Sequence, residues 1–322
     1  MLSRIHQRID DFRRQGRVQT GSLVVSAFGD AIVPRGGRIW LGSLIRLLAP
    51  LDLNERLIRT SVFRLTKESW LLAEPSGRRS NYAFTASGQR RFEEAARTIY
   101  ASAAPQWDQR WRLIMTVGKL SQKERDGLRR AMFWQGFGLL GGDCFVHPGA
   151  DMGAAFDALI TEGFEHVLDK LKPLIAADVH LGGMARDRDM VHEAWDLDQL
   201  SDMYTGFVSC YQPILAQLRE SRGTLDDHPG DDLDDESAFL LRLLLIHDYR
   251  RLLLRDPALP DVLLPADWPG QHARLVCKEI YRRVLAPSER HLDRHFELAS
   301  EATPPAQPLL FERFREADPL AG

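Results

Sequence analysis

Residues 54–85, NERLIRTSVFRLTKESWLLAEPSGRRSNYAFT, combine a helical pattern with a hairpin pattern, and together these decide the fold of the N-terminal part. Residues 54 to about 69 have helical periodicity, and two β-prone runs, WLLAE and NYAFT, flank the turn-forming PSGRRS. At 100° per residue, one arc of this helix is expected to face the core and holds Leu57, Ile58, Ser61, Val62 and Leu65. The opposite arc is cationic and holds Arg56, Arg59, Thr60, Phe63 and Lys67, with Arg64 at its flank.

Two further helices are expected before this one, at 22–32 and 40–48. Asp52, with Glu55 three residues later, matches a capping box that would start the third helix. The order helix, helix, turn, helix, hairpin is that of a winged helix, a fold that places one helix in the major groove of DNA. The sequence therefore predicts a DNA-binding module at the N-terminus.

The charge distribution supports the same interpretation. Residues 1–98 hold 17 Lys and Arg against nine Asp and Glu, a balance of +8, whereas the remainder holds 25 against 36, a balance of −11. A basic segment joined to an acidic body is typical of a polyanion-binding module, although a basic domain can also simply be well solvated.

Candidate DNA-binding residues come from the predicted third helix and from the tip of the hairpin. Guanidinium forks and small polar groups read base edges in the major groove, and arginines on a wing reach phosphates or the minor groove. Arg59 or Arg64 is expected to read a guanine, while Lys67 and Arg78 are expected to contact phosphates. The alternative is that this arc is a solvated helix face. The complete candidate set is Arg56, Arg59, Thr60, Phe63, Arg64, Lys67, Arg78 and Arg79.

The middle of the chain shows a second pattern. Strand candidates in RWRLIMTVGKL, FGLLGGDCFVHP and PLIAADVHL alternate with helices at 121–135 and from 152 onward. This gives the order β-α-β-β-α-β, which is the ferredoxin-like arrangement. The fold class expected for the whole chain is α+β.

Three stretches and their order resemble the phenylacetic acid degradation operon repressor (PaaX) family. They are GRRSNYAFTASGQRRFEEAARTIY (77–100), WDQRWRLIM (107–115) and HDYRRLLLRDPALPDVLLPADWPG (247–270), and the resemblance extends over nearly the whole chain. It implies a homodimeric transcriptional repressor of phenylacetate catabolic genes, released from double-stranded operator DNA by phenylacetyl-CoA or a related aryl-CoA. It also implies a winged-helix domain at 18–98, a ferredoxin-like dimerisation and coupling domain at 107–182, and a helical effector-responsive domain at 190–310. A cytoplasmic location is expected separately, because the sequence shows neither a secretory signal nor a long apolar run.

The resemblance also raises an enzymatic alternative. The family's middle domain is similar to a small CRISPR adaptation protein, and some of those proteins are metal-dependent nucleases with a catalytic acid at the end of the first strand. In this chain the corresponding strand ends in MTVGKL, which contains no carboxylate for a hard cation. A nucleic-acid-processing or acyl-CoA-metabolising enzyme that uses the winged helix for docking is thus the weaker alternative, and no catalytic residue is expected.

The helix expected at 236–254 is apolar nearly all round but carries basic groups. His247, Arg250 and Arg251 project from its apolar side, where an unpaired guanidinium is costly. They could form internal ion pairs with acids such as Asp196, Asp248 or Asp256, or they could meet the phosphates or thioester of an acyl-CoA. The tentative effector-binding set is His247, Arg250, Arg251, Trp195 and Tyr204, of which the two aromatic residues could equally be core residues.

Neither a metal site nor a membrane segment is expected. His291 and His295 are one helical turn apart but have no third ligand nearby, and the acid-rich residues 226–236 do not match an EF-hand loop. The first 17 residues lack the apolar run of a secretory signal. The sequence also has no nucleophile elbow, HExxH or P-loop motif.

Overall fold

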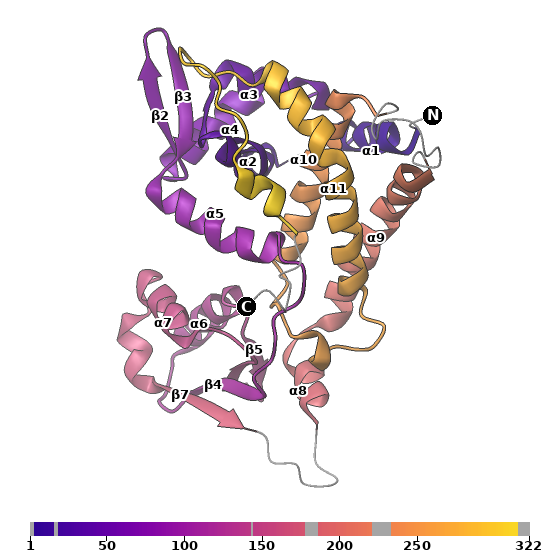
Figure 1. Ribbon diagram of the computed structural model, residues 1–322. Helices are drawn as coiled ribbons and strands as arrows, with labels where there is room; N and C mark the ends of the chain where they lie inside the picture. Colours follow the sequence, from indigo (N-terminus) through magenta and orange to yellow (C-terminus); the bar gives the residue numbers. More distant parts are fainter. Residues whose placement is uncertain (1–2, 16–18, 143, 178–185, 221–232, 315–322) are drawn as a thin grey trace. The chain divides into compact units, whose positions relative to one another are not determined.

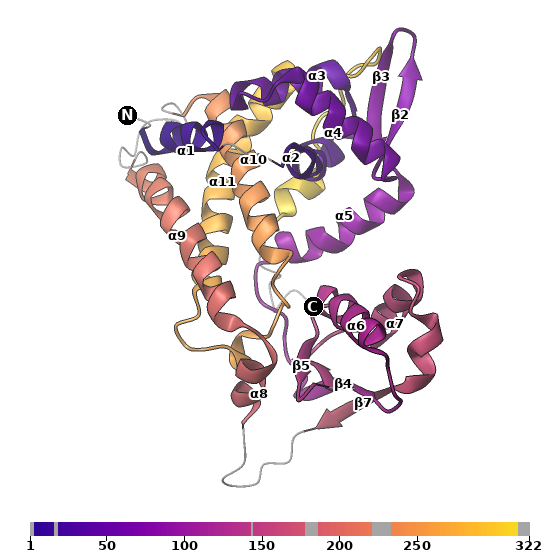
Figure 2. The ribbon, with the colours of Figure 1, turned by 180° about the vertical axis from the view of Figure 1, so that it is seen from behind.

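The computed structural model describes residues 3–15, 19–142, 144–177, 186–220 and 233–314 (Figures 1 and 2). These residues form a mostly helical α+β protein with two small antiparallel sheets, in agreement with the predicted class. They group into two compact units. The first comprises Met1–Ser102, Gly206–Arg251 and Ala273–Gly322, and the second comprises Ala103–Thr205 and Leu252–His272.

The first unit begins with a helix that was not predicted from the sequence. Its buried Ile5, Ile9 and Phe12 follow helical spacing, so a periodic signal was present among the charges. The helix predicted at 22–32 is in fact an α-helix that continues into a π-helical turn. The helical segments up to the hairpin are α1 (Ser3–Arg13), α2 (Thr20–Ala27), η1 (Phe28–Ile32), η2 (Val33–Arg35), α3 (Leu41–Leu48), η3 (Ala49–Leu51) and α4 (Glu55–Lys67).

A three-stranded antiparallel sheet combines two strands that follow α4 with one that precedes α3. Strands β2 (Leu71–Ser76) and β3 (Arg79–Phe84) form the predicted hairpin, and β1 (Arg38–Trp40) pairs with the other edge of β3. Helix α5 (Ala86–Ile99) begins after Thr85, whose hydroxyl caps the Gly88 amide at 2.9 Å. The Phe92 ring of α5 occupies the place where a side chain at Gly29 would lie, so η1 and α5 approach closely.

The three long helices of the C-terminal part are α9 (Leu197–Glu220), α10 (Asp235–Leu253) and α11 (Pro269–His295), and the short η6 (Pro308–Glu312) follows them. The first unit includes α9 from Gly206, α10 up to Arg251 and α11 from Ala273, and the other residues of these helices belong to the second unit. Residues 238–247 of α10 are buried on every side, as the apolar sequence predicts. Arg8 of α1 pairs with Asp248 of α10 at 2.5 Å.

The chain that follows α11 runs along the first sheet. The Trp40 amide donates to the Glu297 carbonyl at 3.0 Å, and the Ala299 amide donates to the Asn81 side chain at 2.8 Å. Buried Ser43 of α3 donates to the His295 carbonyl at 3.0 Å and accepts from the Glu297 amide at 3.0 Å. The C-terminal segment is therefore part of the packing around the hairpin.

The second unit contains the β-α-β-β-α-β order expected for the middle of the chain. Its elements are β4 (Arg110–Thr116), α6 (Gln122–Trp134), β5 (Gly138–Leu140), β6 (Cys144–His147), α7 (Met152–Thr161), η4 (Glu165–Lys170), β7 (Leu171–Ala177), α8 (Asp187–Ala194) and η5 (Asp261–Leu263). Its sheet has the strand order β5-β6-β4-β7, with helices α6 and α7 over one face and a core that includes Ile114, Met132 and Phe145.

The two units differ from the three domains expected from the sequence. Residues predicted to form separate N-terminal and C-terminal domains contribute to the same first unit. Residue 18, residues 178–182 and most of the acid-rich stretch lie outside the described residues. Within the part of the chain that the structure describes, no helix is both long and apolar enough to span a membrane.

Candidate functional site

All eight candidate DNA-binding residues are exposed in the first unit. We call the set the basic face; it comprises Arg56, Arg59, Thr60, Phe63, Arg64 and Lys67 of α4, together with Arg78 and Arg79 at the tip of the β2–β3 hairpin. Phe63 is 61% exposed, which is unusual for a phenylalanine and means that it is not packed into the core. The helix and the hairpin thus present basic side chains to solvent.

Two details of α4 differ from expectation. Asn54, not Asp52, caps the helix, because its side chain accepts from the Arg56 amide at 2.8 Å while Asp52 ends η3 with a positive φ of 55°. Leu57 was expected in the core and is 53% exposed. The inward face is narrower than predicted and consists of buried Ile58, Val62 and Leu65.

Acidic neighbours restrain two of the arginines on α4. Arg59 bonds to Glu55 at 2.7 Å, and Arg64 lies 3.7 Å from Glu68. The Arg64 guanidinium also covers Gly21 of α2, where an added Cβ would lie 2.6 Å from Nη2. Among the described residues, no acid pairs with Arg56.

The hairpin tip is built by a two-residue turn. Ser76 pairs with Arg79, and Gly77 between them has a φ of +60°, a conformation that costs other residues energy. The Arg79 guanidinium lies over the Trp40 ring, 4.2 Å from its centroid. Arg79 is thus held in place by an aromatic side chain while it remains exposed.

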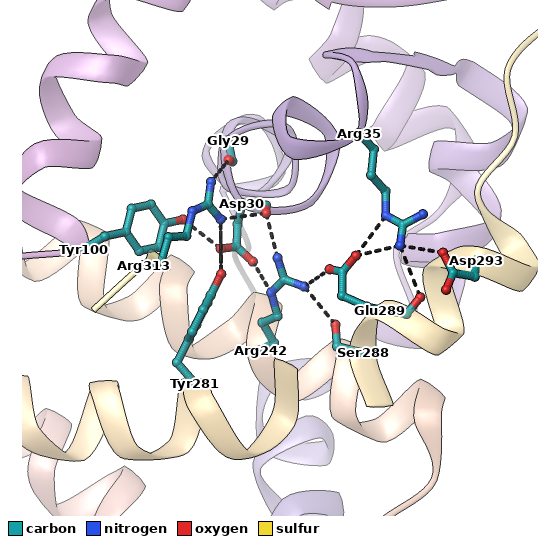
Figure 3. A network of polar contacts seen from close by, with 10 residues as sticks. All are labelled: Gly29, Asp30, Arg35, Tyr100, Arg242, Tyr281, Ser288, Glu289, Asp293 and Arg313. Carbon is teal, nitrogen blue, oxygen red and sulfur yellow. Dashed lines mark hydrogen bonds and ion pairs between the residues drawn. The ribbon is translucent and has the colours of Figure 1, made fainter. Parts of the chain in front are cut away.

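A buried network of charged groups lies inside the first unit (Figure 3). Arg242 of α10 is 1% exposed, and its guanidinium contacts Asp30 at 2.6 Å and also Glu289. Arg35 bonds to Glu289 at 2.6 Å and to Asp293 at 2.7 Å, and Arg313 bonds to Asp30 at 2.9 Å. We call these six residues, Asp30, Arg35, Arg242, Glu289, Asp293 and Arg313, the arginine–carboxylate network.

Asp30 is the centre of this network. One of its carboxylate oxygens accepts from the Tyr100 hydroxyl at 2.7 Å and from the Tyr281 hydroxyl at 3.0 Å. Burial alone would lower the pKa of Arg242, but the surrounding negative charge, Asp30 foremost, raises it. Three guanidinium groups balance three carboxylates, so the network fixes η1, α10, α11 and the segment after η6 to one another.

This network was not predicted from the sequence. An arginine at position 242 inside the run FLLRLLLI signals a buried charge that needs an acidic partner. Its partners Asp30 and Glu289 are 212 and 47 residues away along the chain, and no local pattern connects them.

The basic residues of α10 have partners other than the predicted acids. Arg250 donates to the Ser22 hydroxyl at 2.6 Å and the Ser26 hydroxyl at 3.2 Å, both on α2, and burial lowers its pKa. His247 also contacts the Ser26 hydroxyl, at 3.2 Å. Arg251 is exposed. No described acid forms an ion pair with Arg250 or Arg251, so the expected pairing with Asp196, Asp248 or Asp256 is absent there.

The two aromatic candidates lie in the second unit, whereas His247, Arg250 and Arg251 lie in the first. Trp195 is buried, and its indole donates to the Gly136 carbonyl at 3.0 Å. The Tyr204 hydroxyl donates to Asp256. Both rings are part of the packing, and Trp195 also lines a pocket of about 230 Å³.

Strand β4 ends at Thr116 and is followed by exposed Val117, so no carboxylate stands at the end of this strand. Within the described ranges, no group of three or more His, Cys, Asp or Glu residues could hold a metal ion. His291 and His295 have ring centroids 4.6 Å apart.

Comparisons with known proteins find one family over most of the chain. Residues 19–88 match the PaaX-like protein model, residues 104–170 the PaaX protein central Cas2-like domain, and residues 195–294 the PaaX-like protein C-terminal domain. The transcriptional repressor PaaX of Escherichia coli (strain K12) is 36% identical over 293 residues, covering 91% of this chain and 89% of that protein. A solved structure, the uncharacterized protein Rv0674 from Mycobacterium tuberculosis, matches with a TM-score of 0.45 and 22% identity, covering 76% of this chain and 90% of that one.

Proposed function

The chain belongs to the PaaX family, and from this premise we propose that it is a transcriptional repressor that binds operator DNA through its basic face. The observation that carries the proposal is the exposed basic face on a helix and the hairpin that follows it. We assign the order α2, α3, α4, β2, β3, with β1 at the sheet edge, to a winged helix in which α4 is the recognition helix. The curated relative is a repressor and not an enzyme, and we assign no catalytic step to this chain.

The middle part of the proposed repressor would form a ferredoxin-like domain and join two copies. Its strand order β5-β6-β4-β7 is the order of that fold. Leu113 and Met115 of β4 and Leu174 of β7 share the sheet face opposite the α6–α7 core, and Met115 and Leu174 are 42% and 37% exposed. An apolar patch of this kind suits a homodimer, which would place two recognition helices on two half-sites of an operator.

Replacing Arg59 by alanine should weaken operator binding by about 1–3 kcal/mol and relax base preference at one position. Arg59 can leave Glu55 because this exposed pair is worth little. Arg64 is the less favoured reader, since its guanidinium covers α2. Lys67→Ala should instead weaken binding to all sequences alike. Gel-shift titrations on the operator and on point-substituted operators measure both effects.

The matched control for this prediction is Arg14→Ala, at an exposed arginine directly after α1 and outside the basic face. It should bind the operator like wild type. Wild-type affinity of the Arg59 and Lys67 variants would mean that α4 does not contact the DNA.

The proposed repressor acts in the cytoplasm on genes for phenylacetate catabolism and responds to phenylacetyl-CoA or a related aryl-CoA. An effector releases DNA only if it binds the DNA-free conformation more tightly. The bonds from Arg250 to Ser22 and Ser26 connect α10 with α2, which packs against α4. We assign Arg250 and His247 to this coupling, and exposed Arg251 remains a candidate for a ligand phosphate.

Phenylacetyl-CoA should lower operator affinity by about 5 to 150-fold, and the operator should lower phenylacetyl-CoA affinity by the same factor. Arg250→Gln should reduce this factor because it removes the charge-assisted bonds to α2. Fluorescence anisotropy of labelled operator, with and without phenylacetyl-CoA, measures the factor. If phenylacetyl-CoA lowers the operator affinity of Arg251→Gln by the same factor as that of wild type, Arg251 is excluded as a ligand residue. If the factor is unchanged in Arg250→Gln, the bonds from Arg250 to α2 are excluded as the coupling contact.

A further inference from the structure

The second unit contains a mainly apolar pocket with an aromatic wall and a cation beside it. It is lined by the end of α6, the start of α9 and the segment 255–257. Its apolar lining residues are Phe133, Trp195, Leu197, Leu200, Met203 and Pro257. The volume is about 230 Å³. An apolar cavity of about 150 Å³ is enough to bind benzene, so this pocket has room for a phenyl ring and a few further atoms.

Four hydrogen bonds that involve side chains hold the walls in place without any ligand. Trp195 is tied to the Gly136 carbonyl at 3.0 Å, and the His147 ring bonds to the Pro257 carbonyl at 2.9 Å. The Tyr204 hydroxyl donates to Asp256, whose other carboxylate oxygen accepts from the Ala258 amide at 2.7 Å. Pre-formed, largely apolar concavities with few polar groups are typical of small-molecule sites.

The side chains around the opening are unusual for a surface that meets only water. Phe133 and Trp134 at the end of α6 are 60% and 67% exposed, and Leu254 is 51% exposed. A smaller adjoining pocket is lined by all three of these residues and shares Phe133, Trp195, Arg255 and Pro257 with the first. The apolar surface therefore continues beyond the main pocket.

Arg255 supplies the positive charge, and the lining also includes the acid Asp196 and the amide Gln199. Arg255 lines both pockets and is exposed, and among the described residues the one polar contact of its side chain is with the Met203 sulfur, 3.9 Å away. No described acid pairs with it. Arg255 therefore has a guanidinium that is free of acidic partners in the described ranges and lies beside an aromatic pocket. Such a site suits a ligand that carries both an aromatic ring and an oxygen that can accept a hydrogen bond from the guanidinium.

We propose that this pocket binds an aromatic acyl group, with the ring between Phe133 and Trp195 and the acyl oxygen accepting from Arg255. This inference rests on the proposed function, because it assigns a binding site to the acyl group of the proposed effector. The acyl group is the part in which one acyl-CoA differs from another. The chemistry is shared by phenylacetyl-CoA and free phenylacetate. The pocket has no room for a nucleotide, so the CoA portion of a thioester would extend outside it.

The test is isothermal titration of the full-length protein with phenylacetyl-CoA, phenylacetate and CoA. Met203→Trp partly fills the pocket and should weaken phenylacetyl-CoA binding at least about tenfold; Arg255→Ala should weaken it about tenfold through the lost charge-assisted bond. Arg110→Ala, at an exposed arginine of β4 that does not line the pocket, is the matched control and should bind like wild type. Tighter binding of phenylacetate than of phenylacetyl-CoA would identify the free acid as the source of the ring.

Operator binding without ligand, measured on the same preparations, separates this inference from the function on which it rests. Loss of operator binding by wild type would overturn the repressor assignment. If the protein binds the operator and both Arg255→Ala and Met203→Trp bind phenylacetyl-CoA as tightly as wild type does, only the assignment of the pocket as the binding site is overturned. If wild type binds the operator but neither phenylacetyl-CoA nor phenylacetate, the pocket assignment is wrong for this ligand class. Arg255 is exposed, so its substitution tests the site even if the Met203 variant folds poorly.

Discussion

Arg242→Met is expected to lower the free energy of unfolding of the first unit by about 3–5 kcal/mol. The substitution retains a long apolar stem but removes the guanidinium between Asp30 and Glu289. The buried Asp30 and Glu289 carboxylates would then each lose a guanidinium partner, and an uncompensated buried charge is costly, whereas the third carboxylate, Asp293, is 60% exposed. Guanidinium chloride unfolding, followed by hydrogen exchange of peptides from each unit, measures the loss and assigns it to the first unit.

The control is Arg46→Met, which breaks the half-exposed ion pair with Glu297 at 2.8 Å. An exposed pair contributes less than about 1 kcal/mol, so this variant should unfold nearly like wild type. If the two substitutions have similar cost, the buried network does not stabilise the fold in the way proposed here.

Acidification from pH 7 to pH 4 should destabilise both units through buried histidines. Burial lowers the pKa of His247 in the first unit and of His147 in the second from 6.5 to about 4. A depressed pKa means that the unfolded chain binds protons first, so the stabilisation is complete above pH 6.5 and is lost as the pH falls towards 4. Each histidine accounts for at most about 3 kcal/mol.

The geometry around His147 explains why protonation is resisted. Its Nε2 donates to the Pro257 carbonyl, and its Nδ1 accepts from the Gly149 amide at 2.8 Å. A proton on Nδ1 would face that amide hydrogen. His147→Gln and His247→Asn keep a neutral polar atom near the bonded position and should flatten the pH dependence of unfolding. Exposed His166→Gln should leave it unchanged, and equal slopes for all three variants and wild type would disprove the role of the buried rings.

The parts of the fold that could be predicted are those whose signal is local. The helix and hairpin at 54–85 are encoded by periodicity and turn residues within a single stretch. The exposed basic arc was predicted by placing the residues of this helix at 100° intervals around its axis. Strand β1 was not predicted, because its three residues, Arg38–Trp40, are too few to show a periodic pattern. The strand forms by pairing with the edge of β3.

The parts that could not be predicted depend on partners far away in the chain. The basic residues of α10 were predicted to need polar or charged partners. The sequence does not indicate that Arg250 donates hydrogen bonds to serines of α2, which lie 224 to 228 residues earlier. The same holds for Asp30 and Arg242, whose pairing depends on how η1 meets α10. Tertiary packing, and not the propensity of any single segment, decides these contacts.

The segment after α11 has a consequence for engineering. Because Glu297 and Ala299 bond to Trp40 and Asn81 around the hairpin, a fragment ending near residue 102 would lose partners that its own backbone uses. The proposed DNA-binding module is thus discontinuous in sequence, because residues from both ends of the chain contribute to it. A chimaera that exchanges only the N-terminal third between relatives would separate Trp40 and Asn81 from their partners Glu297 and Ala299. If α4 is the recognition helix as proposed, grafting its exposed residues alone should transfer specificity and leave these hydrogen bonds intact.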